Sequence, residues 1–320
     1  GHGHTHDHTS MVDDAVEASA EGIRALKLSL AGLGITAVLQ LVIVLMSSSV
    51  ALLADTIHNF GDALTAIPLG VAFVLGRRAP TRRYTYGFGR AEDLAGVLIV
   101  AMIAASSIVA AYEAVTRLLD PRDVKHVGFV IAAGIIGFAG NELVASYRIR
   151  VGRRIGSAAL VADGLHARTD GLTSLAVVVG AIGSALGWQL ADPIVGLVIT
   201  VAILGIVRHA ARDIYRRLMD AVDPALVDQV EHELGHVEGV VDVDIVRVRW
   251  IGHELLAEVT IAVDASLSVV DAHAVAERAE HALLHEVPRL AGATIHVNPA
   301  GTGHHDATAH HRDGESSDVE

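Results

Sequence analysis

Two segments of the chain repeat one pattern of acidic and imidazole side chains. Residues 54–65 and 162–173 both read A-D-x-x-H-x-x-x-D-x-L-T, with an offset of 108 residues. Side chains four residues apart lie on one face of a helix, so each segment places a histidine beside an aspartate. The two pairs are His58 with Asp62 and His166 with Asp170. Both lie in long apolar runs, where ionisable groups are costly and usually mark a functional site.

Packing the two helices together would bring two imidazoles and two carboxylates around one point. Such a set is a tetrahedral site for a cation such as Zn²⁺. Imidazole ligands suit zinc, cobalt or nickel, whereas all-oxygen sets suit magnesium, calcium or manganese. The alternative is that these polar groups only bond or cap helices, and the duplication favours the metal site. Asp55 and Asp163 are predicted to support the histidines from an outer shell, with helix capping as the alternative.

A further charged residue, Arg168, follows His166 by two positions and is therefore predicted on roughly the opposite face of its helix. An ion pair between Arg168 and Glu142, which lies in the preceding apolar run, would compensate both charges. This interaction is predicted to be structural and separate from the metal ligands.

The elements that position these residues are six apolar runs, each long enough to span a bilayer as a helix. They are residues 26–48, 50–76, 92–118, 126–149, 158–187 and 193–214. The sequence therefore predicts a mainly α-helical membrane protein with a small α+β domain. The predicted divisions are a disordered His-rich tail at 1–20, a six-helix transport domain at 21–218, a cytoplasmic domain at 219–300 and a disordered acidic, His-rich tail at 301–320.

The charge distribution indicates the orientation in the membrane. Fifteen Lys and Arg residues flank one side of the predicted spans, and three flank the other. The fifteen include four arginines assigned to the connection after the fourth span: Arg148, Arg150, Arg153 and Arg154. The positive-inside rule then places both termini in the cytoplasm. Residues 219–320 hold 5 basic and 20 acidic residues, and no basic stripe indicates nucleic-acid binding. The chain has no cysteine, which excludes disulfides and thiolate metal sites.

The C-terminal segment alternates predicted helices and strands. Helices are expected at 224–236 and 271–286, and strands at 240–251, 255–263 and 293–298. This α-β-β-α-β order is typical of a small ferredoxin-like sandwich. Its helices carry two histidine pairs at four-residue spacing, which either bind metal or are simply exposed: His232 with His236, and His281 with His285. The His-rich tracts at 1–8 and 304–311 either collect metal loosely or are solvated tails.

The chain resembles the cation diffusion facilitators, a family of zinc transporters. The resemblance covers roughly residues 25–300 and rests on the two His-x-x-x-Asp pairs, the six spans, Y-T-Y-G-F-G-R-A-E at 84–92 and I-H-V-N-P at 295–299. It implies that the His/Asp quartet is a zinc-type transport site, that the protein is a homodimer in a bilayer, in bacteria the inner membrane, and that metal leaves the cytoplasm in exchange for protons. It also suggests a cytoplasmic metal site among His273, His296, Asp244 and Glu258.

The predicted mechanism follows from competition between metal and protons. A histidine must be neutral to bind Zn²⁺, and an imidazole changes its charge near physiological pH, so protons can displace the metal. One alternative is an intramembrane zinc enzyme, but four protein ligands and the absence of a His-Glu-x-x-His motif argue against it. Another is a non-transporting subunit, for which a broken quartet is expected. A carrier chiefly for Co²⁺, Cd²⁺ or Ni²⁺ is the remaining alternative.

Overall fold

The computed structural model describes residues 8–47, 66–119, 127–188 and 190–301, which form two compact units. The helical unit extends to Ala221 and also includes the turn Ile251–Glu254. The C-terminal unit comprises Val222–Trp250 and the chain from Leu255 onward.

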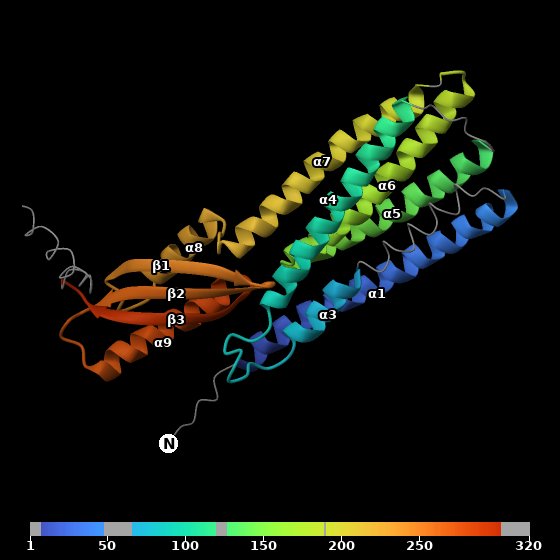
Figure 1. Ribbon diagram of the computed structural model, residues 1–320. Coiled ribbons are helices and arrows are strands. Elements are labelled where there is room, and N and C mark those ends of the chain that lie inside the picture. Colours follow the sequence, from blue (N-terminus) through green and yellow to red (C-terminus); the bar gives the residue numbers. More distant parts are fainter. Residues whose placement is uncertain (1–7, 48–65, 120–126, 189, 302–320) are drawn as a thin grey trace, which may run out of the picture. The chain divides into compact units, whose positions relative to one another are not determined.

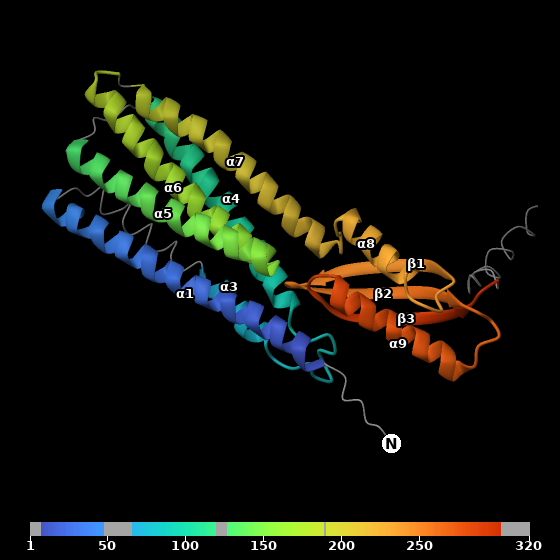
Figure 2. The ribbon, with the colours of Figure 1, turned by 180° about the vertical axis from the view of Figure 1, so that it is seen from behind.

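The helical unit is a bundle of long helices (Figures 1 and 2). Its described helices are α1 (His8–Ser47), α3 (Ala66–Gly76), α4 (Arg90–Leu119), α5 (Val127–Ile155), α6 (Ala158–Ala185) and α7 (Ala191–Leu218). Among the described residues, four segments are long and apolar enough to cross a membrane: Glu17–Ile43, Arg90–Thr116, Val127–Ile155 and Pro193–Leu218. Helix α6 has the length as well, but its first half carries Asp163, Arg168 and Asp170.

The prediction of a disordered tail over residues 1–20 is wrong for its second part, because α1 already begins at His8. Residues 11–20 are rich in alanine and contain no glycine or proline, so they favour a helix. Tertiary contacts then hold this extension in place. Ser19 is buried, and Glu21 forms an ion pair with Arg154 of α5, with 2.7 Å between Glu21 Oε1 and Arg154 Nη1.

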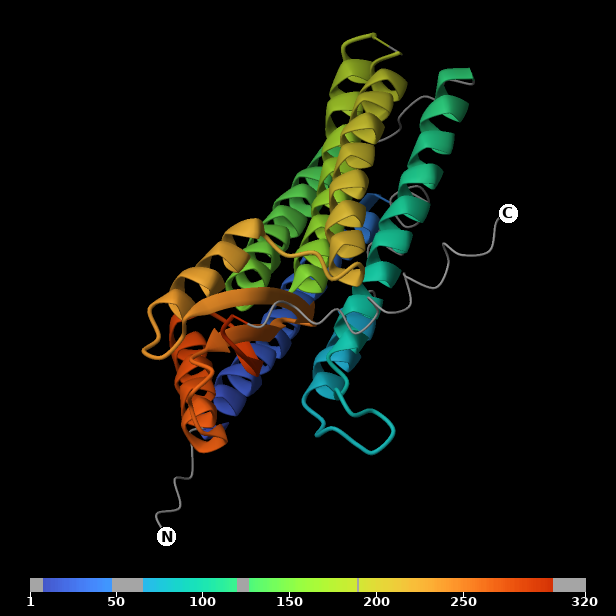
Figure 3. The same cartoon turned by 90° about the vertical axis from the view of Figure 1, so that its left-hand side faces the viewer.

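Helix α6 packs against α5, α7 and α4, while α1 packs against α5 and α3. Helix α3 also lies beside α4 (Figures 1 and 3). Small residues allow the close contact of α5 with α6, as in many membrane helix pairs. A Cβ atom at Gly164 of α6 would lie 3.0 Å from the backbone nitrogen of Ile149 and 3.1 Å from the carbonyl oxygen of Ala145. The face of α6 that carries Asp163 is therefore pressed onto α5.

The C-terminal unit has the predicted α-β-β-α-β order, which is confirmed. Its elements are α8 (Pro224–Gly235), β1 (Asp242–Ile251), β2 (Glu254–Val263), α9 (Val269–Glu286) and β3 (Leu290–Pro299). The sheet order is β1-β2-β3, and β2 pairs in parallel with β3, so α9 is the crossover that parallel strands require. Apolar residues of both helices and all three strands form one core. Asp223 and Ser268 cap the starts of α8 and α9.

Candidate metal centre

Helix α6 brings together one of the two predicted ligand pairs. His166 Nδ1 lies 3.9 Å from Asp170 Oδ1, and their side chains are 2% and 9% exposed. The four-residue spacing explains this proximity, because both side chains leave the helix on one face. Ser157 caps the start of the helix, and its hydroxyl accepts a hydrogen bond from the Leu160 amide. The pair thus offers one nitrogen and one oxygen ligand from a buried position.

The other predicted pair, His58 and Asp62, lies outside the described residues, as does Asp55. The convergence of four ligands therefore stays a prediction. The position of the described pair, His166 with Asp170, agrees with a ligand role. Both side chains are nearly buried within a bundle of long apolar helices, and both leave α6 on the same face.

Asp163, the predicted supporting residue, is fully buried and forms an ion pair with α5. Arg148 Nη1 lies 2.9 Å from Asp163 Oδ2, and the Arg148 side chain is only 2% exposed. This contact ties the helix that carries His166 to its neighbour, one helical turn before the histidine. The support that Asp163 gives to His166 directly stays a prediction.

Arg148 is the residue that the charge count misplaced. The charge pattern predicts it in the connection after the fourth span, but it lies within α5 with its guanidinium in the interior. The sequence contained a signal for this position. Arg148 follows Ala145 by three residues and Asn141 by seven, so all three share the buried face of α5.

The predicted ion pair between Arg168 and Glu142 is confirmed. Arg168 Nη2 donates to Glu142 Oε1 at 2.6 Å, and its Nε donates to Oε2 at 3.0 Å. The hydroxyl of Ser146 donates to the same carboxylate at 3.0 Å. This bidentate pair is half-buried, links α5 to α6 a second time and involves neither His166 nor Asp170.

The residues suggested as a cytoplasmic metal site are not gathered into one site. His273 lies 3.4 Å from Glu277, and Glu258 is paired with Arg249 at 3.1 Å. Asp244 accepts a 3.4 Å hydrogen bond from Asn298, and His296 lies opposite Thr260 in the sheet register. Across the described ranges, no three metal-binding side chains lie together. These residues therefore do not form a three-ligand site within one described chain.

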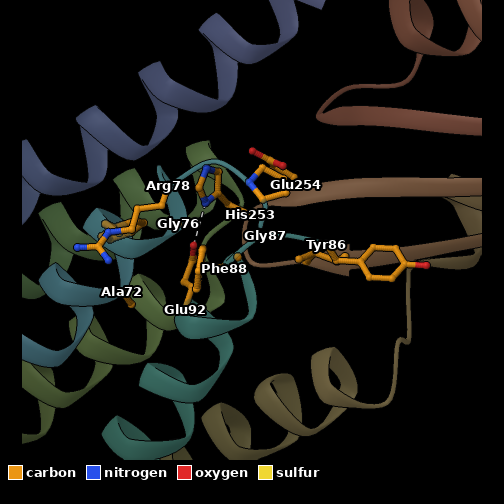
Figure 4. A pocket seen from close by; sticks show the side chains of 13 residues that line it. Ala72, Gly76, Arg78, Tyr86, Gly87, Phe88, Glu92, His253 and Glu254 are labelled. Carbon is orange, nitrogen blue, oxygen red and sulfur yellow. Dashed lines mark hydrogen bonds and ion pairs between the residues drawn. The ribbon is translucent and has the colours of Figure 1, made fainter. Parts of the chain in front are cut away.

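A second polar cluster, which the sequence did not indicate, surrounds a cavity of about 150 Å³ in the helical unit (Figure 4). The dashed line in Figure 4 joins His253 Nδ1 to Glu92 Oε2 at 2.8 Å, and His253 Nε2 lies 3.4 Å from the Ser19 hydroxyl. Both partners of the ion pair are nearly buried. Burial raises the pKa of the nearby Glu254; the charge of His253 opposes this rise and that of Glu92 adds to it.

The backbone at this cavity is shaped by Gly252, the first residue of the two-residue turn between β1 and β2. Its φ of +62° is a conformation that glycine adopts readily. A Cβ atom there would lie 2.9 Å from the Gly89 carbonyl oxygen. The backbone of the turn thus packs closely against Gly89 at the wall of this cavity.

Comparison with known proteins gives matches along most of the chain. Residues 26–219 match a family model described as the cation efflux transmembrane domain. Residues 222–300 match the model described as the cytoplasmic domain of cation efflux proteins. The boundary between the two matches falls beside the boundary between the two structural units, at Ala221 and Val222.

Relatives agree with this assignment. The probable cation efflux system protein Rv2025c of Mycobacterium tuberculosis is 61% identical over 300 residues, covering 94% of this chain and 90% of that protein. The manganese efflux system protein MneP of Bacillus subtilis is 25% identical over 80% of this chain and 88% of its own length. The magnetosome protein MamB of Magnetospirillum gryphiswaldense is 25% identical over 80% and 86%. A solved structure of a MamM variant covers 24% of this chain and 83% of its own, with 22% identity and a TM-score of 0.23.

Proposed function

We propose that this protein exports Zn²⁺ from the cytoplasm in exchange for protons. The premise is that the chain belongs to the cation efflux family, as the matches along its length show. Membership makes it a multi-pass membrane transporter of divalent cations rather than an enzyme. The observation that supports the finer proposal is the buried pair His166–Asp170 on α6. The proposed site is completed by His58 and Asp62.

The chemistry of the ligands supports the preference for Zn²⁺. Two imidazole nitrogens with two carboxylate oxygens suit Zn²⁺, and also Co²⁺ or Cd²⁺, better than Mn²⁺, which favours oxygen ligands. The manganese efflux protein among the relatives makes Mn²⁺ the main competing cargo. A competition assay decides between them.

The same pair, His166 with Asp170, supports the coupling to protons. Zn²⁺ binds the neutral form of His166, so protonation removes the lone pair that the metal needs. The carboxylate of Asp170, 3.9 Å from Nδ1, can then balance the imidazolium charge. Metal and proton are therefore alternative occupants of one buried position. Alternating exposure of this position to the two sides of the membrane would produce exchange.

The cytoplasmic domain of this family is a dimerisation domain, and we propose that the protein is a homodimer. Both termini and the acidic C-terminal unit are proposed to face the cytoplasm, in a bacterial inner membrane. This orientation follows the excess of arginines on one side of the spans.

The test is Zn²⁺ transport by the full chain in proteoliposomes with an imposed proton gradient. Asp170→Ala removes a proposed ligand and is expected to lower the transport rate at subsaturating Zn²⁺ at least tenfold, because a loss of about 1.4 kcal/mol of binding weakens the affinity tenfold. Excess Mn²⁺ is expected to compete poorly, whereas Co²⁺ and Cd²⁺ compete well. Undiminished transport in Asp170→Ala would refute the site.

A matched control exists on α7. His209 Nε2 lies 3.4 Å from Asp213 Oδ2 with the same four-residue spacing, but these side chains are 65% and 41% exposed. Asp213→Ala therefore removes the same chemical group from the same kind of helical pair. Its transport rate is expected to equal that of the unaltered protein. An equal loss in both variants would show that the effect is not specific to the buried pair.

A further inference from the structure

Two pairs of histidines on the C-terminal unit have side-chain rings in edge contact. The ring centres of His232 and His236 on α8 are 4.5 Å apart, and those of His281 and His285 on α9 are 4.3 Å apart. In both pairs the interplanar angle is above 60°. The spacing of four residues brings the rings together, and the same geometry recurs on two different helices.

Both pairs lie on the solvent side of their helices. Helix α8 buries Val230 and Leu234, and each histidine of its pair is two residues from Leu234. Two residues correspond to about 200° around a helix, so the histidines point away from the core. Helix α9 repeats this arrangement around buried Leu283. All four rings are exposed and do not contribute to the core.

The α8 pair also shows an arrangement that prepares an imidazole for metal binding. His236 Nδ1 lies 2.7 Å from the carbonyl oxygen of His232, which can only accept a hydrogen bond. Nδ1 must therefore carry the proton, which leaves the lone pair of the neutral ring on Nε2. A hydrogen bond of this kind is the usual way in which proteins orient a metal-binding histidine.

The electrostatic surroundings favour cations. Residues 222–300 contain 14 Asp or Glu and only 4 Arg, with no Lys. Acidic residues are chain neighbours of both pairs: Glu231 and Glu233 stand on either side of His232 in the sequence, and Glu280 and Glu286 stand next to the α9 pair. A divalent ion is thus attracted to these faces.

We infer that His232/His236 and His281/His285 are two separate two-imidazole binding sites for divalent transition metals of the Zn²⁺ and Co²⁺ class. In the described part of the chain no third histidine or carboxylate completes either group, so water supplies the remaining ligands. Two protein ligands give weaker binding than a four-ligand structural site, and the ion exchanges readily. The sites hold cargo-type ions on the C-terminal unit, and their occupancy does not depend on transport.

The test is histidine footprinting of the full chain in detergent micelles. Diethyl pyrocarbonate modifies free imidazole nitrogens, and peptide mass spectrometry reads each histidine separately, so the His-rich termini do not interfere. Zn²⁺ is expected to protect both rings of each pair in parallel, over the same range of free concentration. Mg²⁺, which prefers oxygen ligands, is expected to protect none of them.

The pairs serve as controls for one another. In His236→Asn, protection of His232 is expected to require at least about tenfold more Zn²⁺, because the second imidazole no longer adds its high local concentration. Protection of His281 and His285 in the same sample should be unchanged, which also reports an intact fold. His285→Asn should give the reciprocal result. Unshifted protection of His232 in His236→Asn, or absence of protection by Zn²⁺, would overturn the inference without affecting the transport proposal.

Discussion

At the residue scale, the spacing of histidine and carboxylate does not by itself identify a site. Three described pairs share the four-residue spacing: His166–Asp170, His209–Asp213 and His273–Glu277. The first is buried and the other two are exposed. Water screens and solvates the exposed pairs, so their interaction is worth little. Burying ionisable groups costs free energy, so the buried pair on α6 indicates a functional site, whereas the exposed pairs do not.

The buried ion pair of Arg148 with Asp163 leads to a stability prediction. Arg148→Met leaves the Asp163 carboxylate buried without a partner, which is expected to cost about 3–5 kcal/mol of unfolding free energy. The double variant Arg148→Met with Asp163→Leu removes both charges and is expected to recover most of this loss. Denaturant unfolding in detergent micelles measures both values.

Arg154 provides the control on the same helix. Its pair with Glu21 is 2.7 Å long, but the arginine side chain is 62% exposed, so Arg154→Met is expected to cost less than about 1 kcal/mol. Similar losses in Arg148→Met and Arg154→Met would contradict the role assigned to burial.

At the element scale, glycines determine how closely α5 approaches its neighbours. A Cβ atom at Gly140 would collide with the Thr36 side chain of α1, and one at Gly137 would lie 2.7 Å from Gln40 Nε2 and 2.9 Å from Ser174 Oγ. Close helix contact through small residues is a main source of stability in membrane bundles. The position of the proposed α6 ligands relative to α1 thus depends on the lack of a side chain at Gly137 and Gly140 of α5.

Gly140→Ala tests this dependence. The added methyl group would lie 2.7 Å from Thr36 Cγ2 and is expected to destabilise the bundle by about 1–3 kcal/mol. Gly34→Ala on α1 is the control, because its Cβ atom would meet no atom within 4 Å. There the gain in helix propensity should leave stability unchanged or raise it by up to about 1 kcal/mol. Thermal unfolding of both variants distinguishes a packing effect from a propensity effect.

At the scale of the whole molecule, two carboxylates are expected to give opposite dependences of stability on pH. Burial raises the pKa of Glu254 above its ordinary value of 4.5. Between 4.5 and the raised pKa the folded state retains a proton that the unfolded state has lost. Stability therefore falls as pH rises through this window. Hydrogen bonds from the Ser266 hydroxyl and amide lower the pKa of exposed Asp264, so its contribution is present above its ordinary pKa and is lost in acid.

Glu254→Gln is accordingly expected to unfold at a higher temperature than the unaltered protein at neutral pH, with the difference shrinking towards pH 4.5. Asp264→Asn should instead lower the unfolding temperature at neutral pH and lose this effect in acid. Melting curves across the acidic to neutral range compare the two. Curves of the same sign for both variants would contradict the assigned pKa directions.

The sequence by itself determined the class of the protein, the order of the C-terminal elements and the ion pair of Arg168 with Glu142. These follow from hydrophobic length, from periodicity and from helical geometry, all of which are local properties of the chain. The duplicated His-x-x-x-Asp pattern likewise predicted that His166 lies beside Asp170, since four residues span little more than one helical turn.

Only the tertiary structure decided which charged groups are partners across large separations. In the sequence Arg148 resembles one more arginine at a membrane boundary, but the packing of α6 against α5 buries it against Asp163. The pair of Glu92 with His253 joins residues 161 positions apart, and no local pattern relates them. The part of α1 near Glu21 is likewise held by a residue far along the chain, Arg154 of α5. Such partners are set by the packing of whole elements, a property that local spacing does not contain.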